Sequence, residues 1–209
     1  LEETDKYLNS DNPNKRSEWI DSLLSTTDYA EFFANKWSSI LRNKRKADTY
    51  TRGTQAFHEW IRQSFHINKP YNQFVAELVT ARGEISHNPA TAWFRNVTDQ
   101  KERLQDTAQV LLGVRLQCAE CHHHPYEKWS QQDYYGFSAF FSRIGKKKTD
   151  MPGEEAVFHN VGLATAKNPK TGQNVKPTLL GGDELDILAE DDPRDDLASW
   201  ITDEKNPFF

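Results

Sequence analysis

The chain has 209 residues and carries 26 Lys and Arg against 31 Asp and Glu, so its formal net charge is −5. This acidic balance argues against a general nucleic-acid binder, because affinity for the phosphate backbone needs a positive surface. Aromatic residues make up 12% of the chain and favour a globular fold with an aromatic core. No apolar run approaches the ~20 residues of a transmembrane helix, so we expect no membrane span in this segment.

Five amphipathic segments in the first two thirds of the chain are predicted to be helices, because apolar residues recur in each at helical spacing. A loop around Asp48–Thr54 is expected to lead into the third helix. Residues 84–97, which contain Pro89, are expected to form an ordered loop. The apolar stripes of the five helices run from Trp19 to Leu24, Tyr29 to Leu41, Phe57 to Phe65, Tyr71 to Val79 and Leu104 to Leu116.

A sixth helix is expected to begin at Ser130, which resembles a capping box with Asp133, and to run to Ile144. The chain changes character after Gly145. Lys146–Lys148 then forms a short charged link, and turn signals separate the extended pieces that follow. These pieces and the final helix are predicted at Ala156–His159, Gly162–Ala166, Asn174–Leu180 and Asp195–Thr202.

These elements predict a mainly α fold, with a bundle-like, multi-helix body and a small β-hairpin appendage near residues 155–180. We divide the chain into a helical domain at residues 1–145 and a second part at residues 146–209. The second part contains the hairpin, an acidic loop and the terminal helix. Its aromatic end, Phe208-Phe209, is expected to lead into a following domain outside this segment.

Both cysteines of the chain lie in the stretch Cys118-Ala119-Glu120-Cys121-His122-His123-His124-Pro125. The pattern Cys-x-x-Cys-His is the attachment signature of c-type haem. Two thiols on one helical turn can each add to a vinyl group along one porphyrin edge, and His122 can then ligate the iron. Aromatic residues that flank the motif are expected to line the haem pocket, and they include Trp129, Tyr134 and Phe137.

Other types of site remain open from the spacing alone. A mononuclear zinc or iron ion could bind Cys118 and Cys121 with His122 or His124 as further ligands. A local disulfide or two plain thiols would give the cysteines a structural role. A thioredoxin-like redox pair would need a βαβ context, which a mainly helical chain does not offer.

A haem iron ligated by His122 has a second axial position. Met151 is the only methionine of the chain and is the first candidate for it. His159 ranks next, followed by His58 or His66, and water is a further alternative. A Met ligand would give a higher reduction potential than a second His ligand.

The region around the motif resembles the planctomycete cytochrome-type domain family, a group of exported bacterial proteins of unknown function. The resemblance is carried by Gly113–Pro125 and by Lys128–Gly136, which continues to Phe140-Phe141. Further similar stretches are Asn68–Val75, Pro169–Gly172, Leu180–Gly182, Asp192–Arg194 and Asn206–Phe209. One departure is His123, where the family commonly has Asp or Asn.

The resemblance implies haem attachment through Cys118 and Cys121, with His122 as the proximal ligand. It also implies an exported, periplasmic protein, in agreement with the attachment of haem to this motif outside the cytoplasm. We therefore expect a c-type haem domain that transfers electrons to or from a partner protein or the following domain of the same chain. The alternative is a zinc or iron site with a structural or binding role, and oxygen or peroxide chemistry at an open haem position would make the protein an enzyme.

Overall fold

The computed structural model describes residues 2–44 and 51–209. The prediction of a mainly α fold is confirmed, because helices account for most of its regular structure. The α-helices are α1 (Glu2–Leu8), α2 (Lys15–Leu24), α3 (Thr27–Ile40), α4 (Thr51–His66), α5 (Tyr71–Val79), α6 (Ala92–Asn96), α7 (Gln100–Asp106), α8 (Gln131–Ala139) and α9 (Pro193–Ile201). Shorter turns are the 3₁₀ helices η2 (Pro89–Thr91) and η4 (Gln117–Glu120) and the π-helical turn η3 (Thr107–Leu111).

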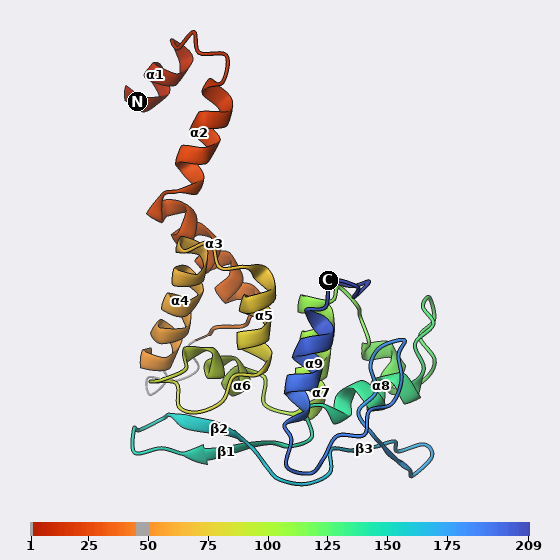
Figure 1. The fold of residues 1–209 in the computed structure, drawn as a ribbon. Coiled ribbons are helices and arrows are strands. Elements are labelled where there is room, and N and C mark those ends of the chain that lie inside the picture. The colour runs from red at the N-terminus through yellow and green to blue at the C-terminus, as the bar shows by residue number, and fades with distance from the viewer. Residues whose placement is uncertain (1, 45–50) are drawn as a thin grey trace.

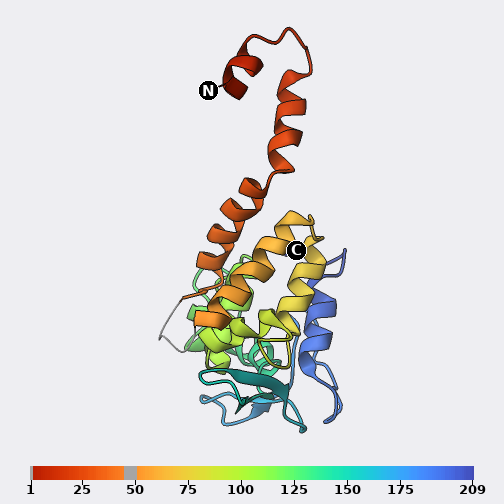
Figure 2. The same ribbon diagram turned by 90° about the vertical axis from the view of Figure 1, so that its left-hand side faces the viewer.

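The helices form a body from which an N-terminal arm projects (Figures 1 and 2). Helices α3, α4 and α5 lie together, α9 lies beside α5, and α8 lies beyond α9 in Figure 1. Helices α1 and α2 form the arm, and neither has a buried residue. The core is therefore built by the chain from α3 onward, including residues of the strands and connecting segments.

Two small antiparallel hairpins complete the fold. Strand β1 (Ile144–Lys148) pairs with β2 (Glu155–His159), and β3 (Ala166–Lys167) pairs with β4 (Asn174–Val175). The first hairpin is tied to the body by Val157, whose backbone N–H donates to the carbonyl of Gly83 at 2.9 Å and whose carbonyl accepts from the N–H of Gly83 at 2.7 Å. The predicted hairpin appendage is thus confirmed, although it begins earlier in the chain than expected.

The predicted helix up to Ile144 is wrong at its C-terminal end. Helix α8 ends at Ala139, and Ile144 already pairs with His159 as the first residue of β1. The charged link Lys146–Lys148 is also part of this strand. Its pattern gives no strand signal, because the strand is specified by backbone pairing with β2 rather than by alternating apolar side chains.

Other predicted boundaries also change on folding. Residues 84–97 are not wholly a loop, because α6 forms where Trp93 and Phe94 enter the core. Residues 51–54 of the expected loop belong to α4, and residues 48–50 lie outside the described residues. The fifth predicted helix ends at Leu111, before Gly113 with its left-handed φ of +68°. The extended piece expected at Gly162–Ala166 contributes only Ala166 to a strand.

The hydrophobic core is continuous across the predicted domain boundary. Phe57 and Phe94 from the helical part share it with Val157 and Leu197 from the later part, and all four side chains are almost fully buried. Burial of such side chains is the main favourable contribution to folding. The boundary after residue 145 stays a prediction of the sequence.

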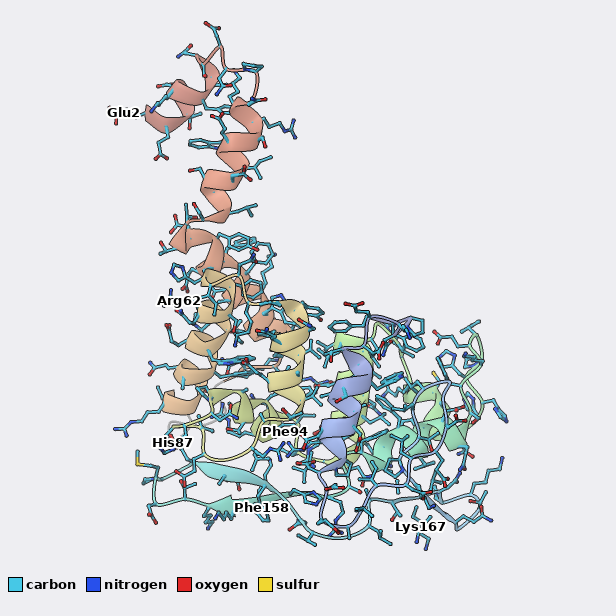
Figure 3. All side chains as sticks on the ribbon, viewed as in Figure 1. Glu2, Arg62, His87, Phe94, Phe158 and Lys167 are labelled. Carbon is cyan, nitrogen blue, oxygen red and sulfur yellow. The ribbon has the colours of Figure 1, made fainter. Side chains whose placement is uncertain are left out.

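A buried arginine at the start of α9 pairs with an acidic neighbour and contacts the body. Arg194 is fully buried, and its Nε and Nη2 donate to the Oδ1 and Oδ2 atoms of Asp192 at 3.0 and 2.6 Å. Its Nη1 donates to the carbonyl oxygen of Ala81 at 2.8 Å. The guanidinium also lies 5.2 Å from the ring centre of Phe94, which is labelled next to α9 in Figure 3. The pair with Asp192 lies within the start of α9, and the contacts of Arg194 with Ala81 and Phe94 join it to the segment after α5 and to α6.

This ion pair predicts a loss of stability in acid. Burial alone raises the pKa of the Asp192 carboxyl, but the hydrogen bonds and charge of Arg194 outweigh it and hold the pKa below its ordinary value. A lowered folded-state pKa stabilises the protein above the unfolded-state pKa of about 3.9, and this stabilisation is lost as the pH falls through the folded-state value. Urea unfolding between pH 7 and pH 3 should therefore show a fall in the free energy of unfolding below about pH 4.

The variant Asp192→Asn tests this assignment. It should be less stable than the wild type at pH 7 and should lose part of the acid dependence. Asp21→Asn, on the exposed face of α2, is the control and should keep the wild-type dependence. Equal acid slopes for Asp192→Asn and the wild type would contradict the role of this pair.

Candidate functional site

The Cys-x-x-Cys segment forms a short 3₁₀ turn between η3 and α8. Cys118 lies within η4 and Cys121 directly follows it. Side chains three residues apart in a 3₁₀ helix lie on the same side. Both cysteines are exposed and free thiols. The turn therefore offers two accessible thiols on one side, which is the arrangement that attachment to one porphyrin edge requires.

The two residues between the cysteines anchor the turn. Ala119 is fully buried, so the backbone is held against the core. The Glu120 carboxylate accepts a hydrogen bond from Lys101 Nζ at 2.5 Å, and its backbone carbonyl accepts one from Gln131 Nε2 at 2.8 Å. These contacts reach α7 on one side and α8 on the other. The backbone of the turn that carries the two thiols is therefore held by neighbouring helices.

A buried tyrosine completes this anchor. The Tyr134 hydroxyl donates to Glu120 Oε2 at 3.3 Å and accepts from Gln105 Nε2 at 3.3 Å. Burial raises the pKa of Tyr134, and the neighbouring Glu120 carboxylate adds to this effect, while the Gln105 hydrogen bond opposes it. The hydroxyl therefore stays protonated at neutral pH and remains a donor to Glu120.

His122 presents one free ring nitrogen. Its side chain is exposed, and its Nδ1 lies 2.6 Å from the carbonyl oxygen of His123. A carbonyl oxygen can only accept a hydrogen bond, so Nδ1 carries the proton. In the neutral ring the lone pair is then on Nε2. A hydrogen bond from the second ring nitrogen to a carbonyl is the usual way in which a metal-ligating His is oriented.

His124 has a different role. Its Nδ1 accepts hydrogen bonds from the backbone N–H groups of Tyr126 and Glu127 at 3.3 and 3.0 Å. Its own backbone N–H donates to the carbonyl of Trp129 at 2.8 Å. The side chain therefore closes the loop between the motif and α8. Only its Nε2 would be available to a metal.

An open groove of about 390 Å³ lies beside His122. One wall comes from the start of α8 and the other from the turn between β3 and β4. The groove is lined by His122, His123, Ser130, Gln131, Gln132, Asn168, Lys170 and Thr171. The sequence did not predict that Asn168, Lys170 and Thr171 line this groove. Their turn signal was visible, but nothing local to it indicated that it packs beside the motif.

The aromatic residues that were expected to form the pocket lie in the core. Trp129 is 3% exposed, and Tyr134 and Phe137 are fully buried. None of them lines the groove in the described part of the chain. Their burial stabilises the body that carries the motif, whereas the groove next to His122 is lined by residues with polar side chains.

The candidates for the second axial position lie on other elements. Met151 is in the turn between β1 and β2, at the opposite end of the body from η4 and α8 in Figure 1. His159 is on β2, and its Nε2 lies 3.5 Å from the carbonyl of Ala189. His58 and His66 are on α4, and His58 Nε2 contacts Asn35 Oδ1 at 3.2 Å. The structure brings none of these four residues into the groove at His122.

The donor set fits a c-type haem. Covalent attachment needs two accessible thiols on one turn and one imidazole nitrogen with a free lone pair, and Cys118, Cys121 and His122 provide them. A four-ligand zinc or iron site needs four donors to converge on one point. Across residues 2–44 and 51–209, no group of three or more His, Cys, Asp or Glu side chains is arranged to hold a metal ion.

Comparison with known proteins identifies the family. A family model named PSCyt2, with the description "Protein of unknown function (DUF1549)", matches residues 1–146. The chain belongs to the PSCyt2 family. The matched part contains the Cys-x-x-Cys-His turn of this PSCyt2 chain and the helices that hold it. No curated protein and no solved structure matches the chain.

A helix that crosses a membrane must be both long and apolar. Within the described residues, no helix combines the length and the apolar character that crossing a bilayer requires.

Proposed function

We propose that this PSCyt2 domain binds one c-type haem and transfers electrons. The observation that carries the proposal is the hydrogen bond from His122 Nδ1 to the His123 carbonyl, which leaves Nε2 free one residue after two exposed thiols. Bound haem would supply one-electron redox chemistry at its iron.

The chain's own residues would hold the haem in two ways. Cys118 and Cys121 would form thioether bonds to it, and His122 Nε2 would ligate its iron. Glu120, held by Lys101 and Gln131, would fix the position of the turn. Because the motif lies at the surface, the attached haem would have an exposed edge. Electron transfer to another protein or domain requires such access.

Export and a redox partner are part of the same proposal. Haem is attached to Cys-x-x-Cys-His outside the cytoplasm, so a haem-bearing protein would be periplasmic. A net charge of −5 favours association with a partner of positive surface charge. The partner is either a separate redox protein or a further domain of the same chain.

The decisive experiment is mass spectrometry of denatured protein after export to the periplasm of a host with haem-attachment machinery. The expected result is a mass increase of one haem that survives denaturation, together with the absorption bands of a c-type haem. A mass without haem but with about one zinc or iron per chain would transfer the assignment to a mononuclear site. Free thiols without any metal would reject both assignments and leave a structural role.

A further inference from the structure

A second cavity, which we call the aromatic pocket, lies among helices α3, α4 and α5, on the side of the body that carries the arm (Figure 1). Its volume is about 400 Å³. The aromatic residues of its lining come from all three helices and are Tyr29, Trp37, Phe65, Tyr71 and Phe74. No residue of the Cys-x-x-Cys-His turn lines it, so the pocket is independent of the proposed haem site.

Four of these rings form a row with steep angles between neighbours. The ring centre of Phe65 lies 6.3 Å from that of Tyr29 and 6.3 Å from that of Trp37, with interplanar angles of 78° and 47°. Trp37 in turn lies 5.9 Å from Tyr71 at 60°. Tyr71 is held in place by stacking on Phe209 at 5.1 Å. The row therefore presents ridges with gaps between them rather than one flat face.

Polar groups along the row are free to bind a ligand. Across residues 2–44 and 51–209, the hydroxyls of Tyr29 and Tyr71 and the indole N–H of Trp37 form no hydrogen bond with the protein. The indole N–H can only donate. Burial raises the pKa of Tyr71, so its hydroxyl stays protonated at neutral pH and can also donate. A ligand that matches this row has hydrogen-bond acceptors at intervals along its length.

The charge at the pocket is already neutralised. Lys69 is the charged residue of its lining, and its Nζ donates to Glu77 Oε2 at 2.5 Å. The same ammonium group lies 5.2 Å from the ring centre of Trp60. Lys69 therefore has its counter-charge within the protein, and the pocket favours a neutral ligand with apolar surface.

We propose that the aromatic pocket binds a proline-rich segment of a partner protein in the polyproline II conformation. This conformation has no internal hydrogen bonds, so its carbonyl oxygens can accept from the Tyr29, Trp37 and Tyr71 groups. Proline has no N–H and requires no acceptor from the pocket. Aromatic-lined grooves bind such segments because the extended backbone is already ordered before it docks.

The spacing of the rings agrees with this ligand. A polyproline II helix rises about 3.1 Å per residue, so two residues span the distance between neighbouring rings of the row. Proline rings can then enter the gaps between the inclined aromatic rings. The nine prolines of this chain are all isolated in the sequence, so the segment comes from another protein.

Isothermal titration calorimetry of the 209-residue protein with a blocked decaproline peptide tests the proposal. A blocked Gly-Ser decapeptide has the same length but is flexible, and it should not bind. Tyr71→Phe keeps the ring and removes one donor, so it should weaken decaproline binding about 2- to 10-fold. Trp37→Phe removes the indole N–H and should also weaken binding.

Tyr126→Phe is the matched control. Tyr126 is 93% exposed and does not line the pocket, so the same chemical change at this position should leave the affinity for decaproline unchanged. Tyr71→Phe and Tyr126→Phe should both keep the wild-type melting temperature, because neither hydroxyl has a hydrogen-bond partner among the described residues.

Three results would overturn the proposal. They are the absence of decaproline binding, equal binding of the Gly-Ser peptide, and equal decaproline affinity in the wild type, Tyr71→Phe and Trp37→Phe. Cellohexaose serves as a neutral oligosaccharide probe, because sugars also offer acceptors and apolar faces. Binding of cellohexaose without binding of decaproline would assign the pocket to a carbohydrate instead. Decaproline binding that weakens in Tyr71→Phe and not in Tyr126→Phe is the expected result.

Discussion

The double replacement Cys118→Ala with Cys121→Ala is expected to abolish covalent haem attachment completely. Each single replacement should leave at most one thioether and reduce the yield of haem-loaded protein. Both thiols are exposed and contribute nothing to the buried core, so the free energy of unfolding of the haem-free double variant should stay within about 0.5 kcal/mol of the haem-free wild type. Mass spectrometry of denatured protein and urea unfolding measure the two quantities.

A neighbouring substitution serves as the matched control. His123→Asn changes an exposed side chain next to the iron ligand but keeps the backbone carbonyl that orients His122. This variant should attach haem like the wild type. Haem that remains bound to the denatured double cysteine variant would show that attachment does not proceed through these thiols.

The largest expected effect on stability comes from Arg194→Leu. The variant removes the bidentate partner of Asp192, whose side chain is 5% exposed. The buried carboxylate keeps only Arg82, whose half-exposed Nη1 lies 3.9 Å away, as a counter-charge. Removing one partner of a buried ion pair typically costs about 3–5 kcal/mol. The Ala81 carbonyl also loses its hydrogen-bond donor, and Phe94 loses its contact with the guanidinium. Urea unfolding at pH 7 should show a loss of this size.

Arg82→Leu is the control for Arg194→Leu. Arg82 pairs with Asp195 at 2.6 Å, and both of these side chains are about half exposed, at 51% and 50%. Its Nη1 also lies 3.9 Å from Asp192 Oδ2, but it makes no hydrogen bond to that carboxylate, whereas Arg194 makes two from its side chain. An exposed ion pair contributes about 0–1 kcal/mol, so this variant should lose far less stability. A loss below about 1 kcal/mol for Arg194→Leu would mean that Asp192 gains solvent or another partner, and that Arg194 does not fix α9 to the body.

The sequence by itself determined the local features of the molecule. Helical periodicity predicted the helices of the body, because an apolar stripe such as that of Phe57 to Phe65 faces the core only when the segment is helical. The capping box of Ser130 and Asp133 was readable for the same reason, since its partners are three residues apart. The Cys-x-x-Cys-His spacing likewise places both thiols on one turn without help from distant residues.

Only the tertiary structure decided the features that depend on distant partners. Strand β1 exists because β2 pairs with it, and its own Lys146–Lys148 stretch has no intrinsic strand pattern. The flanking aromatic residues that suggested a pocket entered the core, because complete burial of Tyr134 and Phe137 removes more apolar surface from water than an open groove would. Lys170 lies at the groove of His122 because the β3–β4 hairpin packs near α8. The two residues are about fifty positions apart, so no local sequence pattern indicates that they are close in space.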